Sequence, residues 1–116
     1  MVRHMPNQSM QLNRVFQALA DPTRRAVLER LSSGPAAMGE LAQPFDMALP
    51  SFSQHLDVLE DCGLVRSSKT GRVRTYQLSP RPLKAAEHWM AVQRAAWGRR
   101  LDQLDDFLKD LKEKKR

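Results

Sequence analysis

The chain has 116 residues, of which 41% are hydrophobic and 28% charged, a composition typical of one globular domain with its own core. No apolar run could span a bilayer and the N-terminus lacks a secretory signal, so we expect a cytoplasmic protein without a membrane segment. The net charge of +6 favours an anionic partner, and the single cysteine, Cys62, excludes an intrachain disulfide and a cysteine-cluster metal site.

The first half of the chain predicts four helices, after a segment over residues 1–8 that we expect to be disordered. Apolar residues at helical spacing predict the first helix over residues 9–20. Asp21 and Pro22 predict the start of the second, because Asp is a favoured N-cap and Pro is tolerated in the first helical turn. The buried face of this second helix should hold Val27, Leu28 and Leu31.

Two further helices joined by a short connection predict a helix-turn-helix. The first of the pair covers residues 38–45, and the second begins at Leu49 and is ended by Gly63. Spacings of three, four and three residues place four apolar side chains of the second helix on one buried face. These four are Leu49, Phe52, Leu56 and Leu59.

The outer face of this second helix carries small polar residues in its first turns. Such turns reach base edges in the major groove of B-DNA, and Gln can pair with adenine. We therefore predict that Ser51, Ser53 and Gln54 read the DNA sequence. His55 lies at the border of the buried face, and we predict a phosphate or structural contact there. Simple solvation is the alternative for an isolated helix, but the helix-turn-helix context favours DNA.

A strongly basic hairpin follows, with β-prone runs over residues 64–67 and 73–78 and a tight turn at Gly71. Residues 64–84 include six basic side chains and no Asp or Glu. Charge that only protected an edge hairpin from strand pairing would not need to be of one sign. We predict that three residues near the turn supply affinity for DNA phosphates, with little sequence information. They are Lys69, Arg72 and Arg74.

A long last helix over residues 80–111 completes a domain of residues 9–111, before a basic tail over residues 112–116. Its apolar residues follow a three-four rhythm over more surface than one small domain covers, which favours a homodimer. The predicted interface comprises Leu12, Val15, Phe16, Leu19, Met90, Trp97, Leu101, Leu104 and Leu108. The expected fold is mainly α with a small β-hairpin, a winged helix-turn-helix that dimerises through its terminal helices.

Four segments resemble the ArsR family of bacterial winged-helix repressors: ALADPTRRAVLERL, MGELAQPF, LPSFSQHLDVLEDCGLV and GRVRTYQL. The resemblance implies a homodimer that binds a pseudo-palindromic operator in double-stranded DNA and represses transcription until a signal changes its geometry. Metal-sensing members carry a cysteine pair in the third helix, which this chain lacks. Others carry carboxylate and histidine ligands on the last helix, where Glu87 and His88 here have no second histidine after them. We therefore expect no metal and no cofactor.

One alternative function is a winged helix whose basic surface binds an acidic partner protein. An enzyme is not expected, because the chain has no Gly-rich phosphate loop and no nucleophile with a nearby base. The sequence leaves open whether Arg24 or Arg25 contacts phosphate. It also leaves open an effector, either a small molecule or a redox signal at Cys62.

Overall fold

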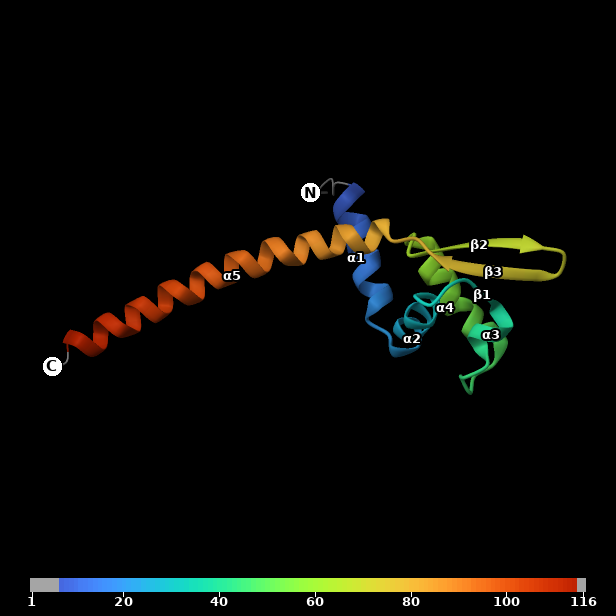
Figure 1. Cartoon of the computed structure of the whole chain (residues 1–116), viewed down its shortest axis with the longest axis horizontal. Coiled ribbons are helices and arrows are strands. Elements are labelled where there is room, and N and C mark those ends of the chain that lie inside the picture. The colour runs from blue at the N-terminus through green and yellow to red at the C-terminus, as the bar shows by residue number, and fades with distance from the viewer. Residues whose placement is uncertain (1–6, 115–116) are drawn as a thin grey trace, which may run out of the picture. The chain divides into compact units, whose positions relative to one another are not determined.

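The computed structural model describes residues 7–114, with side chains from Met10 onward. The elements in chain order are α1 (Asn7–Leu19), α2 (Pro22–Leu31), β1 (Ala36–Ala37), α3 (Met38–Ala42), α4 (Leu49–Asp61), β2 (Val65–Thr70), β3 (Val73–Leu78) and α5 (Arg81–Lys114). The described residues up to Ala86 form one compact unit, and the remainder of α5 forms a second (Figure 1). The predicted fold class, a mainly helical winged helix-turn-helix, is confirmed.

The two predicted terminal segments lie partly outside the described residues, because residues 1–6 and 115–116 are not described. Residues 7 and 8 belong to α1, and α5 continues through residues 112–114. No helix within residues 7–114 combines the length and the apolar character needed to cross a bilayer.

The break between α1 and α2 follows from an aspartate and a proline. Asp21 has an extended backbone, and its side chain accepts a 3.0 Å hydrogen bond from the backbone N–H of Arg24, which makes it the N-cap of α2. Pro22 follows in the first turn, where its missing N–H would have no helical partner. The predicted start of the second helix is confirmed. Of its three predicted core residues, Val27 and Leu31 are buried and Leu28 is partly buried against the core.

The helix-turn-helix is formed by α3 and α4, and α3 is shorter than predicted because it ends at Ala42. Phe45 lies in the connection instead, with its ring centroid 5.4 Å from that of Phe52. The prediction that Leu49 is buried is wrong, since this side chain is 57% exposed. Phe45 from the connection packs against this end of the core, so Leu49 in the first turn of α4 lies beyond it. Phe52 and the other two predicted positions are fully buried.

Gly63 ends α4, as predicted, in a Schellman motif. Its φ of +83° favours glycine, and its N–H donates a 3.0 Å hydrogen bond to the carbonyl of Glu60. The N–H of Leu64 donates a second 3.0 Å bond to the carbonyl of Leu59. These two bonds close the helix and direct the chain into β2.

The wing is an antiparallel hairpin of β2 and β3, paired from Val65 opposite Leu78 to Thr70 opposite Val73. Two residues form its turn, and the first, Gly71, has a φ of +63°, the conformation that two-residue hairpin turns require at this position. β2 extends three residues beyond the predicted strand, because pairing with β3 determines its length. The wing therefore projects as a long, narrow ribbon (Figure 1).

A third strand, β1, was not predicted. Ala36 and Ala37 pair with Tyr76 and Thr75, which gives the strand order β1-β3-β2. Alanine has a low preference for strands, so this strand depends on its neighbour rather than on its own residues. It anchors the start of the helix-turn-helix to the sheet, because α3 follows it directly.

The core of the compact unit draws on its helices and its sheet. The largest fully buried side chains are Tyr76, Phe52, Leu41, Leu56, Leu59, Leu64, Val15, Val27 and Val65. Complete burial of each such side chain contributes about 1.5–3 kcal/mol relative to exposure. Three of the nine belong to α4, which is therefore anchored along its inner face.

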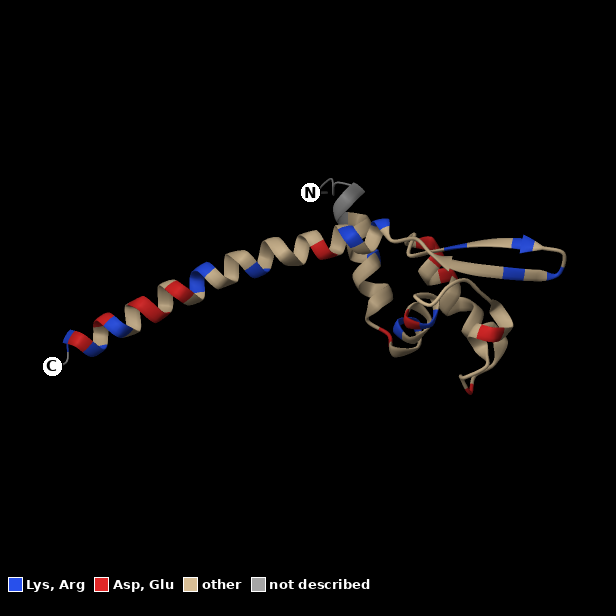
Figure 2. Cartoon of the chain, in the orientation of Figure 1, with Lys and Arg blue, Asp and Glu red and all other residues tan. Residues whose placement is uncertain are grey.

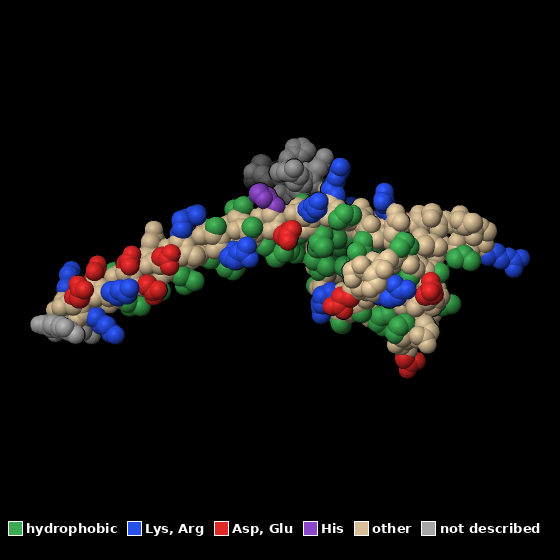
Figure 3. All heavy atoms as spheres, in the orientation of Figure 1, with side chains coloured by type: hydrophobic (Ala, Val, Ile, Leu, Met, Phe, Trp, Pro, Cys, Tyr) green, Lys and Arg blue, Asp and Glu red, His purple; other side chains and the backbone are tan. Residues whose placement is uncertain are grey.

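The helix α5 begins in the compact unit, where Pro82 and Ala86 are buried. From Glu87 onward its large apolar side chains are exposed, and Figure 3 shows apolar side chains along this part of the helix. They are Trp89, Met90, Val92, Trp97, Leu101, Leu104, Phe107, Leu108 and Leu111. The three-four rhythm that the sequence showed thus forms an exposed apolar stripe in the second unit.

Candidate nucleic-acid interface

The outer face of α4 presents polar side chains at its first turns. Ser51 and Gln54 are exposed, three residues apart on one side of the helix, and Ser53 is partly buried. The opposite side carries the buried Phe52 and Leu56. The helix is thus fixed from behind while its N-terminal half offers hydroxyl and amide groups, as the sequence predicted.

The first turn of α4 has no side-chain cap. Its N-cap residue is Ala48, which makes no side-chain hydrogen bond, and Pro50 has no N–H to donate. The remaining first-turn N–H groups, those of Leu49 and Ser51, have no helical carbonyl partner. N–H groups without a partner at a helix N-terminus suit an anion such as a backbone phosphate.

The wing concentrates positive charge at its turn. Lys69 and Arg74 are directly opposite each other on the two strands, and Arg72 lies in the turn between them. All three side chains are exposed, and Figure 2 shows the basic residues distributed along the hairpin. Like charges directly opposite on paired strands repel each other, so this arrangement costs stability unless an anion neutralises it.

The base of the wing is tied to the C-terminal half of α4. Ser67 donates a 2.7 Å hydrogen bond from Oγ to Oε2 of Glu60, and NH1 of Arg74 donates a 2.9 Å bond to the same Oγ. The serine hydroxyl therefore connects the wing to α4. This connection was not predicted, because the bonded residues lie seven positions apart on different elements.

The acidic residues of α4 occupy the C-terminal half of the helix. Asp57, Glu60 and Asp61 all follow His55, whereas the first two turns carry no charge (Figure 2). Carboxylates repel phosphate, so only the N-terminal half of α4 suits DNA. That the N-terminal half of α4 faces the nucleic acid stays a prediction.

Two arginines at the start of α2 cap the end of α1. Arg24 donates from Nε to the carbonyl of Ala18 (2.8 Å) and from NH2 to the carbonyl of Gln17 (2.9 Å). Arg25 donates from NH1 to the carbonyl of Leu19 (2.7 Å). The last carbonyls of a helix lack intrahelical partners and carry partial negative charge, so guanidinium groups stabilise them. The structure thus engages both arginines that the sequence left open as phosphate contacts.

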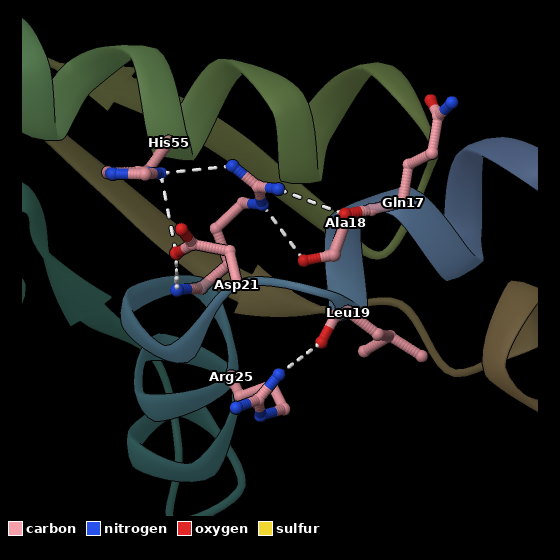
Figure 4. A network of polar contacts seen from close by, with 7 residues as sticks. Gln17, Ala18, Leu19, Asp21, Arg25 and His55 are labelled. Carbon is pink, nitrogen blue, oxygen red and sulfur yellow. Dashed lines mark hydrogen bonds and ion pairs between the residues drawn. The ribbon is translucent and has the colours of Figure 1, made fainter.

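His55 joins this corner from α4, as Figure 4 shows. Its Nδ1 lies 3.1 Å from NH1 of Arg24 and 3.7 Å from Oδ2 of Asp21. The first distance fits a hydrogen bond in which Nδ1 accepts from the guanidinium, whereas the second is too long for a hydrogen bond. His55 is partly buried in this network. The sequence allowed a phosphate contact or a structural contact here, and the phosphate contact stays a prediction.

Asp21 interacts with both neighbours at the corner. The hydrogen bond from the Arg24 N–H is the main cause that lowers the pKa of Asp21, and electrostatic interactions with His55 and Arg24 lower it further, against the opposing effect of burial. The carboxylate therefore stays ionised and caps α2 over a wider pH range than a free aspartate would.

Cys62 lies at the end of α4 and is 3% exposed. Burial raises the pKa of its thiol, and Sγ donates a 3.4 Å hydrogen bond to the carbonyl of Leu59. Within residues 7–114 no three His, Cys, Asp or Glu side chains gather into a group that could hold a metal ion. The thiol is placed as a small core residue.

The predicted interface residues fall into two groups. Those on α5, from Met90 to Leu108, are exposed, while Leu12, Phe16 and Leu19 on α1 are partly buried against the core. Val15 corrects the prediction, because at 1% exposure it belongs to the core of its own chain and offers no surface to a partner. Val15 and Ala18 occupy the inner side of α1, which hydrophobic spacing alone did not distinguish from the outer side.

Comparisons with known proteins indicate the same fold. A model of a helix-turn-helix domain matches residues 19–68. The HTH-type transcriptional regulator Rv2034 of Mycobacterium tuberculosis is 51% identical over 73 residues, which cover 63% of this chain and 68% of that protein. The transcriptional repressor SdpR of Bacillus subtilis is 34% identical over 79 residues, with coverages of 68% and 88%.

A solved structure extends the likeness to most of the chain. The crystal structure of the ArsR family transcriptional regulator RHA00566 is 55% identical in sequence and matches with a TM-score of 0.75. The match covers 84% of this chain and 97% of that one. It therefore includes residues beyond the helix-turn-helix itself.

Proposed function

Because this chain belongs to the ArsR family of winged helix-turn-helix transcriptional regulators, we propose that it is a homodimeric repressor that binds a pseudo-palindromic operator without a metal at the known family sites. The observation that carries the proposal is the pairing of two surfaces. The polar first turns of α4, which lack a side-chain cap, lie on the same unit as a wing whose turn is lined by exposed cations. One surface suits base edges and the other suits phosphates.

The proposed division of labour follows from this pairing. Gln54 and its neighbours Ser51 and Ser53 read bases, while Lys69, Arg72 and Arg74 bind phosphate. Arg72 at the turn makes no hydrogen bond among the described residues, whereas Arg74 is already oriented by Ser67. We therefore assign Arg72 the larger electrostatic contribution.

The proposed homodimer rests on the apolar stripe of α5. Five of its members are spaced four, three, four and three residues apart, the pattern with which helices pack against each other: Trp97, Leu101, Leu104, Leu108 and Leu111. Half or more of the side chain of Trp97, Leu101 and Leu104 is exposed, and soluble monomers rarely expose such a continuous apolar stripe. A second copy covers it and supplies the second reading helix for a dyad operator.

The proposed independence from metal rests on the ligand types. The segment of α3, where metal-sensing members carry a cysteine pair, has no cysteine, and Cys62 is buried at the end of α4. Metal analysis of the purified protein tests this part, and zinc bound in stoichiometric amount would contradict it.

The test of the function uses DNA selected by the wild-type protein from a random library, measured by fluorescence titration against scrambled DNA. Gln54→Ala should lose preference at one base position, worth about 1–3 kcal/mol, while Gln43→Ala, a second exposed glutamine, should not. Arg72→Ala should weaken binding to every sequence and reduce the slope of log affinity against log salt by about one, while Arg99→Ala on α5 should not. If no sequence is preferred and neither variant matters, the alternative of a module for an acidic protein partner gains support.

A further inference from the structure

Three elements meet at one side chain in the corner network, which comprises Gln17, Ala18, Asp21, Arg24 and His55. The backbone N–H of Arg24 donates a hydrogen bond to Asp21, the N-cap of α2. The guanidinium of Arg24 donates hydrogen bonds to two carbonyls at the end of α1, and its NH1 contacts Nδ1 of His55 on α4. The residues in the last contact are 31 positions apart in the chain. The network therefore links α1 to the recognition helix through the start of α2 (Figure 4).

The chemistry of this link requires arginine. A guanidinium presents its donors in a rigid planar fork, and here three of its nitrogens point to three acceptors on two other helices. A lysine at the same position has a single ammonium on a flexible stem, which cannot reach the α1 carbonyls and His55 in the same way. Charge is thus the lesser part of what Arg24 contributes, and geometry is the greater part.

The contact between Arg24 and His55 adds a directional interaction to the apolar packing of α4. Phe52 and Leu56 hold α4 against the core by contacts that are not directional, and the contact of Arg24 with His55 adds a directional constraint to them. A hydrogen bond weakens steeply with angle. His55 follows Gln54 directly, so a bond that fixes His55 also fixes the direction in which Gln54 points.

We infer that Arg24 and His55 are positioning residues for DNA recognition, which set the orientation of α4 relative to α1 and thereby the distance between the two reading helices of the dimer. This inference deepens the proposed function and rests on it, because it takes α1 as part of the dimer and a dyad as the target. Half-site spacing in a dimeric helix-turn-helix protein follows from the separation of its recognition helices. The corner network sets that separation within each protomer.

The test measures spacing preference, which a role in stability alone would not change. A half-site selected by the wild-type protein from a random library is placed twice in dyad orientation, with the optimal spacer and with spacers changed by one and two base pairs. Arg24→Lys and His55→Leu should weaken binding at the optimal spacing about tenfold and flatten the dependence on spacing. His55→Asn keeps an acceptor near the position of Nδ1 and should restore the wild-type profile.

Arg25→Lys is the matched control. It disturbs one carbonyl bond at the same end of α1 without touching His55, so it should lower thermal stability and leave the spacing profile unchanged. All measurements are made well below the melting temperature, with folding verified by circular dichroism. If Arg24→Lys keeps the wild-type spacing profile, as Arg25→Lys does, Arg24 is only a cap for α1 and the inference is overturned.

The affinity for DNA with a single half-site tests the role of Arg24 and His55 independently of the dimer. If the wild-type protein shows no spacing preference at all, the dyad proposal fails, and the positioning of α4 is then judged on single half-site affinity. Arg24→Lys and His55→Leu should each lower the affinity for a single half-site. The double variant should bind it no more weakly than the single variant with the lower affinity. Independent, additive effects would overturn the coupling between the two residues.

Discussion

The helices α4 and α5 carry the same three-four rhythm of apolar residues, with opposite results. In α4, Phe52, Leu56 and Leu59 are fully buried, whereas Trp97, Leu101 and Leu104 of α5 are at least half exposed. The spacing of apolar residues predicts an apolar face but does not indicate which surface covers it. In α4 the covering surface belongs to the same chain, and in the proposed dimer the surface that covers α5 belongs to a second copy.

The largest expected effect comes from truncating the buried rhythm. Leu56→Ala should lower the free energy of unfolding by about 2–5 kcal/mol, because it removes a fully buried side chain and leaves a cavity. Urea unfolding monitored by circular dichroism measures this loss. The loss should be the same at every protein concentration, since the contacts are made within one chain.

The matched control for that experiment is Leu101→Ala on α5. If α5 is covered by a second copy, the effect of Leu101→Ala should depend on protein concentration, because dissociation then accompanies unfolding. An effect of Leu101→Ala that is large and independent of concentration would place Leu101 in the core of its own chain and remove the contrast between the two helices.

The second prediction breaks the proposed interface directly. Leu101→Asp combined with Leu108→Asp places two carboxylates in the apolar stripe, so sedimentation should shift to a monomer. Affinity for the selected dyad should fall by more than about tenfold, because one protomer then binds without the help of the other. Asp106→Asn, on an exposed position of the same helix, should change neither quantity. A variant that remains dimeric would locate the interface elsewhere.

The contrast also shows where sequence reasoning succeeds. Local signals were sufficient for the start of α2 at Asp21 and for the stop of α4 at Gly63, since each depends on a few neighbouring residues. They failed for Leu49, which is exposed, while Phe45 from the preceding connection packs against Phe52. β1 was missed because its strand character comes from its partner.

The candidate site divides in the same way. The spacing of buried residues in α4 places Ser51 and Gln54 on the outer face without further information. The corner network could not be predicted, because Arg24 and His55 are brought together only by the packing of α2 against α4. Val15 shows the same limit, since the rhythm of α1 did not indicate which side the core of its own chain would cover.

A third and smaller effect concerns the charge of Asp21, the N-cap of α2. The pKa of Asp21 is lowered, so its carboxylate stabilises the fold above the unfolded-state pKa of about 3.9, and that contribution disappears as the pH falls through the folded-state value. Asp21→Asn keeps a capping oxygen without the charge. Urea unfolding at pH 7 and at pH 3 measures this contribution. Between the two pH values the free energy of unfolding should fall less for Asp21→Asn than for the wild type. Asp46→Asn, in the exposed connection, should behave like the wild type.

The smallest expected effect is that of oxidising Cys62, at the end of α4. Burial raises the pKa of its thiol and leaves it 3% exposed, and the thiolate is the reactive form, so peroxide should not reach it in the folded protein. DNA affinity should then stay within about twofold of the untreated value. Ala95→Cys in a Cys62→Ala background puts a thiol on an exposed position of α5 and should be oxidised readily, as mass spectrometry will show. Oxidation of Cys62 in the folded protein, with a loss of affinity, would instead make the end of α4 a redox-responsive element, because an oxidised side chain cannot remain in a core that fits the thiol.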